Sequence, residues 1–235
     1  MFFFWGDWTI IIVLPAIIFS IWAQIKVSSA FKKYSEIHTR SGMTGEQAAR
    51  RILAENGITD VRVEHIHGNL NDHFDPREKV IRLSDNVYSS TSAAAVGVAA
   101  HEAGHAVQYA EHYAPVKLRT AIVPATQFSS YIAPILFIIG LLFAGTEAGG
   151  ALMLIGILLF AITAFFQLVT LPVEFNASRR AMQALTASGR LSDDELEGSK
   201  KVLEAAALTY VAALATSLLT LLRLVLIARG GNRRR

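Results

Sequence analysis

Two histidines and a glutamate in one short segment could together bind a metal ion and activate water. His101, Glu102 and His105 form the pattern H-E-x-x-H in an alanine-rich segment, residues 92–111, that we predict to be a helix with Ser92 as its N-cap. Residues four apart share a face of a helix, so the two imidazoles can supply two ligands of a tetrahedral zinc site. Glu102 would then lie where its carboxylate can accept a proton from water. The alternative interpretation is a surface helix that carries these residues by chance.

The composition is typical of a membrane protein. Of the 235 residues, 52% are hydrophobic and 17% are charged, against roughly 25% charged in soluble domains. The chain has no cysteine, which excludes disulfides and thiolate ligands, so His, Asp or Glu must bind any metal. The formal net charge is only +3, and the basic residues flank apolar segments. Membrane topology explains that distribution better than nucleic-acid binding does, and we expect no nucleic-acid partner.

Four apolar segments reach the length of about 20 residues that crosses a bilayer. We divide the chain into an N-terminal transmembrane anchor (1–25), a polar region with the H-E-x-x-H motif (26–121), a transmembrane hairpin (122–171), a second polar helical region (172–204) and a C-terminal hydrophobic segment with a basic tail (205–235). A cleavable signal peptide is disfavoured, because the first segment lacks a basic start and an A-x-A site. We expect Asp7 inside the anchor and three tryptophans near its two interfaces, namely Trp5, Trp8 and Trp22.

Basic residues predict the orientation in the membrane. Lysines and arginines are concentrated in residues 26–119 and 172–201 and are absent from the N-terminal flank, so we expect both polar regions on the cytoplasmic side. The two spans of the hairpin return the chain to the side it left, which allows residues after Leu171 to meet the H-E-x-x-H helix. A complete fourth span would place the arginine tail outside, against the rule. Either the last segment does not cross, or the larger cytoplasmic regions outweigh the tail.

Smaller elements are expected between the anchor and the motif. Thr44 and Gln47 form a capping-box pattern that begins a helix, and Gly57 ends it. Two segments, 61–66 and 79–84, alternate apolar and polar residues and predict a small sheet or hairpin, with turn-rich sequence between them. The segment 79–84 could be an edge strand that pairs with an extended peptide, or part of an internal hairpin. We interpret three nearby histidines as solvated loop residues, with a role in a site as the alternative: His65, His67 and His73.

A catalytic zinc site needs a third protein ligand. In the longer pattern H-E-x-x-H-x-x-G-x-x-H the glycine position is Gln108 and the last position is Glu111, so the turn that would bring Glu111 back is missing. His112 lies further along the same helix. Glu174 follows Pro172, which we expect to begin a helix at the membrane boundary. A carboxylate there could instead only stabilise the helix N-terminus; we favour Glu174 as the third ligand.

Three segments resemble the YugP-like family of membrane-bound neutral zinc metallopeptidases: 83–88 (LSDNVY), 101–106 (HEAGHA) and 172–181 (PVEFNASRRA). More distantly, the chain is similar to gluzincins of the HtpX and CAAX-prenyl-protease type, in which an H-E-x-x-H helix and a later Glu-x-x-x-Asp helix build the site. The first resemblance covers essentially the whole chain.

The resemblance implies a mainly α, integral membrane fold with a gluzincin-like H-E-x-x-H helix, a small β-hairpin or sheet and transmembrane helices. It also implies a zinc-dependent endopeptidase with one Zn2+ per chain, bound by His101, His105 and Glu174, with Glu102 as general base. The position of the gluzincin aspartate is Ser178 here, a neutral group that can accept from an imidazole N–H but cannot supply charge.

Other roles stay open. A donor to the oxyanion could come from Tyr88, Tyr109, His112, Arg179 or Arg180, and spacing does not choose among them. We expect membrane lipid and a protein or peptide substrate as partners. One alternative is a membrane scaffold or adaptor with a non-catalytic zinc site. Another is a transporter or channel component, although such proteins usually carry ionisable groups inside their spans, and the candidates here are few: Asp7, Gln167 and Arg223.

Overall fold

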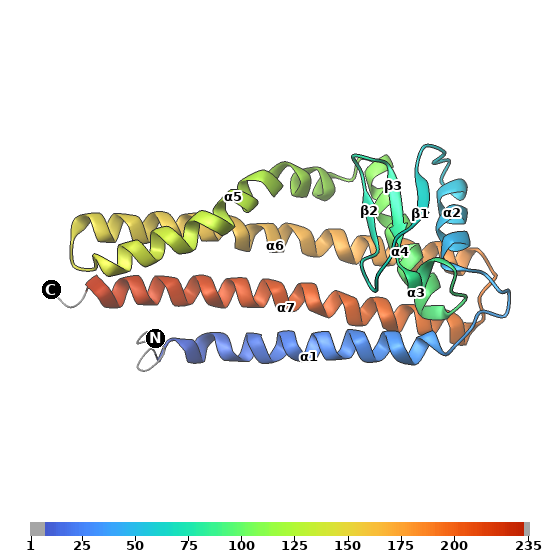
Figure 1. Cartoon of the computed structure of the whole chain (residues 1–235), viewed down its shortest axis with the longest axis horizontal. Coiled ribbons are helices and arrows are strands. Elements are labelled where there is room, and N and C mark those ends of the chain that lie inside the picture. The colour runs from blue at the N-terminus through green and yellow to red at the C-terminus, as the bar shows by residue number, and fades with distance from the viewer. Residues whose placement is uncertain (1–7, 233–235) are drawn as a thin grey trace. The chain divides into compact units, whose positions relative to one another are not determined.

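The computed structural model describes residues 8–232, so Trp5, Asp7 and the arginine tail lie outside the described residues (Figure 1). In chain order the elements are α1 (Ile10–Ser35), α2 (Gly45–Glu55), β1 (Arg62–His65), β2 (His73–Asp75), β3 (Val80–Leu83), α3 (Asp85–Tyr88), α4 (Ala93–Ala110), α5 (Ala114–Leu142), α6 (Glu147–Ala187) and α7 (Asp193–Asn232). The expectation of a mainly helical chain with a small sheet is confirmed.

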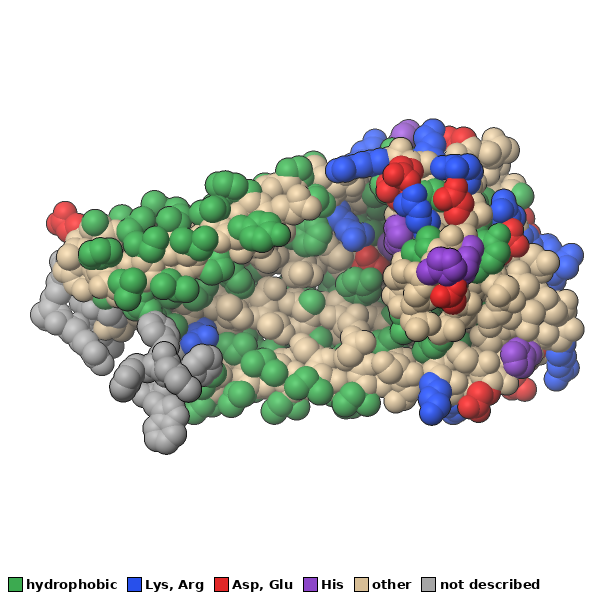
Figure 2. Space-filling model, in the orientation of Figure 1, with side chains coloured by type: hydrophobic (Ala, Val, Ile, Leu, Met, Phe, Trp, Pro, Cys, Tyr) green, Lys and Arg blue, Asp and Glu red, His purple; other side chains and the backbone are tan. Residues whose placement is uncertain are grey.

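Two compact units share these elements. The apolar unit consists of Met1–Trp22, Leu118–Leu171 and Thr209–Arg235, and the polar unit of Ala23–Lys117 and Pro172–Leu208. Within the part of the chain that the structure describes, four helices are long and apolar enough to cross a membrane: α1, α5, α6 and α7. Hydrophobic side chains cover the helices of the apolar unit, whereas charged side chains and histidines gather over the polar unit (Figure 2). An apolar surface of this extent suits contact with lipid.

Inside the apolar unit, pairs of helices run antiparallel. Ser20 Oγ lies 3.2 Å from Thr216 Oγ1, and Arg223 Nε donates to Thr9 Oγ1 at 3.3 Å, so residue numbers rise along α1 as they fall along α7. A Cβ atom added to Gly140 of α5 would lie 2.6 Å from the backbone N of Met153 in α6. Small residues of this kind let membrane helices approach closely. α7 is one continuous helix and contains no turn at which the chain could re-enter.

The polar unit holds a three-stranded sheet of order β1-β3-β2. β1 pairs with β3 in parallel, and β2 pairs with β3 antiparallel, so a hairpin does form, but between β2 and β3. β2 lies inside the segment that we expected to be only turns. Because β3 is the central strand, the alternative in which residues 79–84 form a free edge strand is wrong, and the alternative of an internal hairpin is confirmed. Its buried residues join the core of this unit, which includes Ile81, Leu83, Val87, Val96 and Leu185.

Capping residues set the limits of α2 and the start of α4 as expected. Thr44 and Gln47 make both hydrogen bonds of the capping box at the start of α2, and Gly57 follows the helix with a φ of +68°. Ser92 caps α4, its hydroxyl accepting from the N–H of Ala95 at 3.2 Å. These caps satisfy N–H groups that have no partner inside the helix.

α6 differs from the prediction. Pro172 lies inside this helix rather than at its start. A proline ring has no N–H, so the carbonyl of Leu168 loses its helical partner, but the helical residues on both sides keep the chain in register through this position. Glu174 is therefore a mid-helix residue, and its alternative role at a helix N-terminus is wrong. After α6 the chain turns at Gly189, which has a φ of +61°, and α7 begins at Asp193.

Candidate metal centre

The helix that carries the motif is surrounded by other elements of the polar unit. α4 contacts α2, α3, β2 and β3, and its alanines are buried except Ala110 at its end. A Cβ on Gly104 would lie 2.6 Å from the carbonyl oxygen of Ala177 in α6, and a Cβ on Gly97 would lie 3.0 Å from Cβ of Ser199 in α7. Glycine at these two positions therefore permits close approach of backbones that any side chain would push apart.

Two imidazole nitrogens and one carboxylate oxygen converge on one point between α4 and α6. Nε2 of His101 lies 3.1 Å from Nε2 of His105, and Oε2 of Glu174 lies 3.3 and 3.4 Å from these two nitrogens. In a tetrahedral zinc site with bonds of about 2.0–2.1 Å, neighbouring ligand atoms are separated by about 3.3 Å. The donor atoms thus already have the spacing that a single zinc ion requires.

The other candidates for a third ligand are placed elsewhere. Glu111 pairs with Arg180 at 2.6 Å. His112 follows the end of α4 with a φ of +57°, which turns the chain away from the helical path. Of the three candidates weighed from the sequence, the structure brings only Glu174 to the two imidazoles, across 69 residues of chain from His105.

Charge at this point favours a cation. Burial would lower the pKa of His105, but its hydrogen bond to Glu174 and the charges of Glu102 and Glu174 outweigh that effect and raise it. The same negative potential that favours an imidazolium would stabilise a divalent ion bound by neutral imidazoles. Glu174 is only 3% exposed, so water screens little of that potential.

Each imidazole has a second partner behind it. Nδ1 of His101 lies 3.1 Å from Oγ of Ser178, and Nδ1 of His105 lies 3.0 Å from Oε1 of Gln108. When Nδ1–H donates to these oxygens, the lone pair of Nε2 points at the convergence point. Outer partners of this kind fix the tautomer and the ring orientation of a metal ligand. Here both of them are neutral side chains.

Gln108 belongs to a buried network that sequence reasoning missed. Its Nε2 donates to the carbonyl oxygen of Val173 and to Oδ1 of Asn176, both at 2.8 Å. Oδ1 of Asn176 also accepts from Nε of Arg180 at 2.8 Å. In the sequence, Gln108 is notable only because it occupies the glycine position of the longer pattern H-E-x-x-H-x-x-G-x-x-H. Its spacing of three residues from His105 on one helix was the available signal.

Glu102 is buried and has an acidic neighbour, Asp72. Its charge acts on both His105 and Asp72. The carboxylate of Asp72 accepts from the backbone N–H of Ser84 at 2.7 Å and from its hydroxyl. Burial raises the pKa of the Asp72 carboxyl despite these hydrogen bonds, and the charge of Glu102 raises it further. The sequence placed Asp72 in a turn and gave no sign of this proximity.

The candidate oxyanion donors differ in what they contact. Tyr88 packs edge-on against His65, and Arg180 is held by Glu111 and Asn176. Tyr109 packs against Phe74 of β2. That one of these side chains donates a hydrogen bond to the oxyanion stays a prediction.

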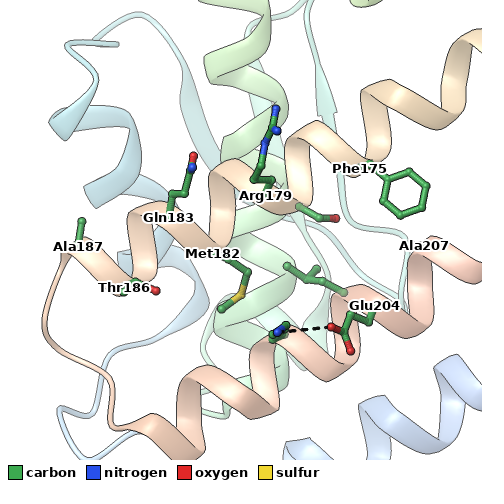
Figure 3. Close-up of a pocket in the computed structure, with 11 residues that line it drawn as sticks. Phe175, Arg179, Met182, Gln183, Thr186, Ala187, Glu204 and Ala207 are labelled. Carbon is green, nitrogen blue, oxygen red and sulfur yellow. Dashed lines mark ion pairs between the residues drawn. The ribbon is translucent and has the colours of Figure 1, made fainter.

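A groove lies beside the metal centre, between the end of α6 and the start of α7 (Figure 3). Its volume is about 660 Å³, and Ser178, the partner of His101, forms part of its wall. Met182 points from α6 toward α7 in Figure 3, and Leu203 and Ala207 complete an apolar lining. At the rim, Lys200 and Glu204 form an ion pair at 3.7 Å. An apolar side chain of about the size of leucine could enter such a groove.

These features agree with the comparisons to known proteins. Residues 9–229 match the family described as "Putative neutral zinc metallopeptidase", and the chain belongs to this family. It is 50% identical over 223 residues to the "Putative membrane protease YugP" of Bacillus subtilis (strain 168), an alignment that covers 95% of this chain and 97% of that protein. No solved structure matches the chain. Together with the four long apolar helices, the relative indicates a multi-pass membrane protein of the protease class.

Proposed function

We propose that this chain is a zinc-dependent membrane endopeptidase of gluzincin type, with one Zn2+ per chain bound by His101, His105 and Glu174. The observation that carries the proposal is the convergence of three donor atoms at 3.1–3.4 Å from one another. Membership in a zinc peptidase family supports the identity of the ion.

The roles of the side chains follow from their positions. A zinc ion at the convergence point would polarise the scissile carbonyl and lower the pKa of a water molecule towards about 7. Glu102, the neighbour of His101 on α4, accepts the proton of the attacking water and delivers it to the leaving amine. Ser178 and Gln108 hold the two imidazoles in the orientation that presents Nε2. The low exposure of Glu102 and Glu174 limits competition from bulk solvent.

We place the metal centre on the cytoplasmic side of the membrane. The described lysines and arginines lie mainly in the polar unit, which contains the centre, and basic residues favour the cytoplasm. In this arrangement α1 enters from outside and α5 and α6 form a hairpin that returns to the cytoplasmic side. α7, antiparallel to α1, then crosses outward. The variant Arg77→Cys, which places a single cysteine at an exposed position of the polar unit, tests this orientation. Intact cells are treated with a cysteine-reactive reagent that cannot cross the membrane. Labelling of the variant in intact cells would contradict the cytoplasmic position.

Two substitutions separate metal binding from catalysis. Glu102→Gln keeps all three zinc ligands, so we expect the purified protein to retain zinc and to lose cleavage of casein and of itself. Glu174→Ala removes a ligand, and we expect it to lose the zinc ion of this centre together with the cleavage activity. Glu55→Gln changes a carboxylate that pairs with Arg51 on the surface of α2 and serves as the matched control.

The outcomes discriminate between the proposal and its alternative. Unchanged cleavage by Glu102→Gln would contradict the role of Glu102 as base. Zinc bound by the wild-type protein without any hydrolysis would favour a non-catalytic scaffold or adaptor. Zinc retained by Glu174→Ala at the centre of His101 and His105, with wild-type affinity, would show that Glu174 is not the third ligand.

A further inference from the structure

A second group of potential metal ligands lies on the surface of the polar unit. β1 and β3 are parallel, with His65 in register with Leu83, so the carboxyl ends of both strands meet at one edge of the sheet. His65 ends β1, and His67 follows it by two residues. Asp85 begins α3 directly after β3. The topology thus brings together side chains that are about 20 residues apart in sequence.

The donor atoms of this group are close. Nε2 of His65 lies 2.7 Å from Oδ1 of Asp85, and Nδ1 of His67 lies 3.5 Å from the same oxygen. The two imidazole rings stand edge to face with centroids 5.2 Å apart. One ligand atom from each residue falls within 4.8 Å of the others, as in the group formed by His101, His105 and Glu174.

Asp85 is held in place for such a role. The backbone N–H of Gly68 donates to its Oδ2 at 2.9 Å, which leaves Oδ1 directed at the two histidines. A simple hydrogen bond joining β1 to α3 would need only His65 and Asp85. It gives no reason for His67, which is 95% exposed, to turn toward the same oxygen.

We propose that His65, His67 and Asp85 form a second divalent metal site, independent of the first. Two imidazoles and one carboxylate suit zinc, nickel, cobalt or copper, whereas magnesium and calcium prefer oxygen ligands alone. The spacing of 3.5 Å already matches the roughly 3.3 Å between ligands of a tetrahedral ion, and the spacing of 2.7 Å has to widen by about 0.6 Å. Water completes the coordination from the exposed side.

The position of this site gives it a structural consequence. Its ligands join the start of the loop that follows β1 to the start of α3. In that loop Gly68 has a φ of +117° and Leu70 a φ of +54°. The same loop carries Asp72, which bonds to Ser84 beside Asp85. A bound ion would therefore fix the start of this loop, while the hydrogen bond of Asp72 holds its end, and the loop would be protected from proteolysis.

Metal binding by the full-length protein in detergent tests the proposal. Zn2+ alone is the probe, and bound zinc is measured by equilibrium dialysis with elemental analysis. We expect the wild-type protein to bind two zinc ions per chain, one of them exchanged more easily. His67→Ala should bind only one and should lose the protection of residues 66–72 by zinc. His73→Ala removes an exposed histidine at the start of β2, directly after the same loop, whose Nδ1 bonds to the carbonyl of Asn71. This variant should still bind two zinc ions.

His101→Ala separates this proposal from the proposed function. It should lose the ion of the first centre and keep the more easily exchanged ion. A wild-type protein that binds only one zinc, or a His67→Ala variant that binds as much as wild type, would overturn the second site. Neither result would affect the assignment of the first centre.

Discussion

The most specific prediction concerns Gln108, because it touches no metal and yet should control metal affinity. Gln108 is fully buried and makes hydrogen bonds to His105, Val173 and Asn176. Gln108→Met has a similar volume but leaves Nδ1–H of His105 without an acceptor. Loss of an outer partner of a metal-bound histidine typically lowers metal affinity by about 10–100-fold. We expect a decrease in that range, measured by competition with a chelator.

Stability should change as well, by an amount that follows from the same contacts. Each neutral hydrogen bond contributes about 0.5–1.5 kcal/mol, and a buried donor without a partner costs about 1–3 kcal/mol. Oδ1 of Asn176 still accepts a hydrogen bond from Arg180 in this variant. The loss of stability is therefore smaller than the loss expected for three separate hydrogen bonds. We expect Gln108→Met to be destabilised by roughly 2–4 kcal/mol, measured by unfolding in detergent.

Gln108→Glu distinguishes orientation of the imidazole from general stability. The carboxylate still accepts from His105, but it can no longer donate to Val173 and Asn176. We therefore expect Gln108→Glu to be about as unstable as Gln108→Met and to bind zinc more tightly than that variant. Gln183→Met, a change of the same type at an exposed position of α6, is the control. Zinc affinity of wild-type strength in Gln108→Met would refute the reasoning.

Two further predictions concern the same centre. Gly104→Ala should destabilise the protein by about 1–3 kcal/mol and weaken zinc binding, because the added Cβ would lie 2.6 Å from the carbonyl oxygen of Ala177. Thermal unfolding and zinc content measure these two effects. A variant with wild-type stability and full zinc content would contradict the prediction. Acidification should release zinc, because protons compete for the imidazoles and the raised pKa of His105 favours the proton. At pH 5.5, one unit below the ordinary imidazole pKa of about 6.5, apparent affinity should be more than about tenfold lower than at pH 8, and a pH-independent affinity would contradict this assignment.

Local patterns were sufficient to predict the limits of α2 and the start of α4. The capping box of α2 and the serine cap of α4 depend on residues within four positions of one another, and the structure contains both. The four apolar segments were equally predictable, because length and hydropathy alone decide whether a helix can cross a bilayer.

Relations between distant segments were harder to predict. The alternation of residues 79–84 indicates a strand but contains no information about its neighbours, so its central position in the sheet had to come from the structure. The parallel pairing of β1 with β3 is also what brings His65 to Asp85, a proximity with no signature in the sequence. Pro172 is the opposite case, since its local preference for a helix start is overridden by the helical residues on both sides.

The unusual composition of α4 explains how the metal centre can exist at all. Alanines and glycines bury little apolar area each, so this helix gains less from burial than one with leucines would. Their small size lets the backbone of α6 approach until Gly104 faces the carbonyl of Ala177. At that separation the side chain of Glu174 spans the gap to both imidazoles. Ser178, one turn further along α6, reaches the Nδ1 of His101. Larger residues at the positions of α4 that face α6 would fill a core better and would move the carboxylate out of reach of the two imidazoles.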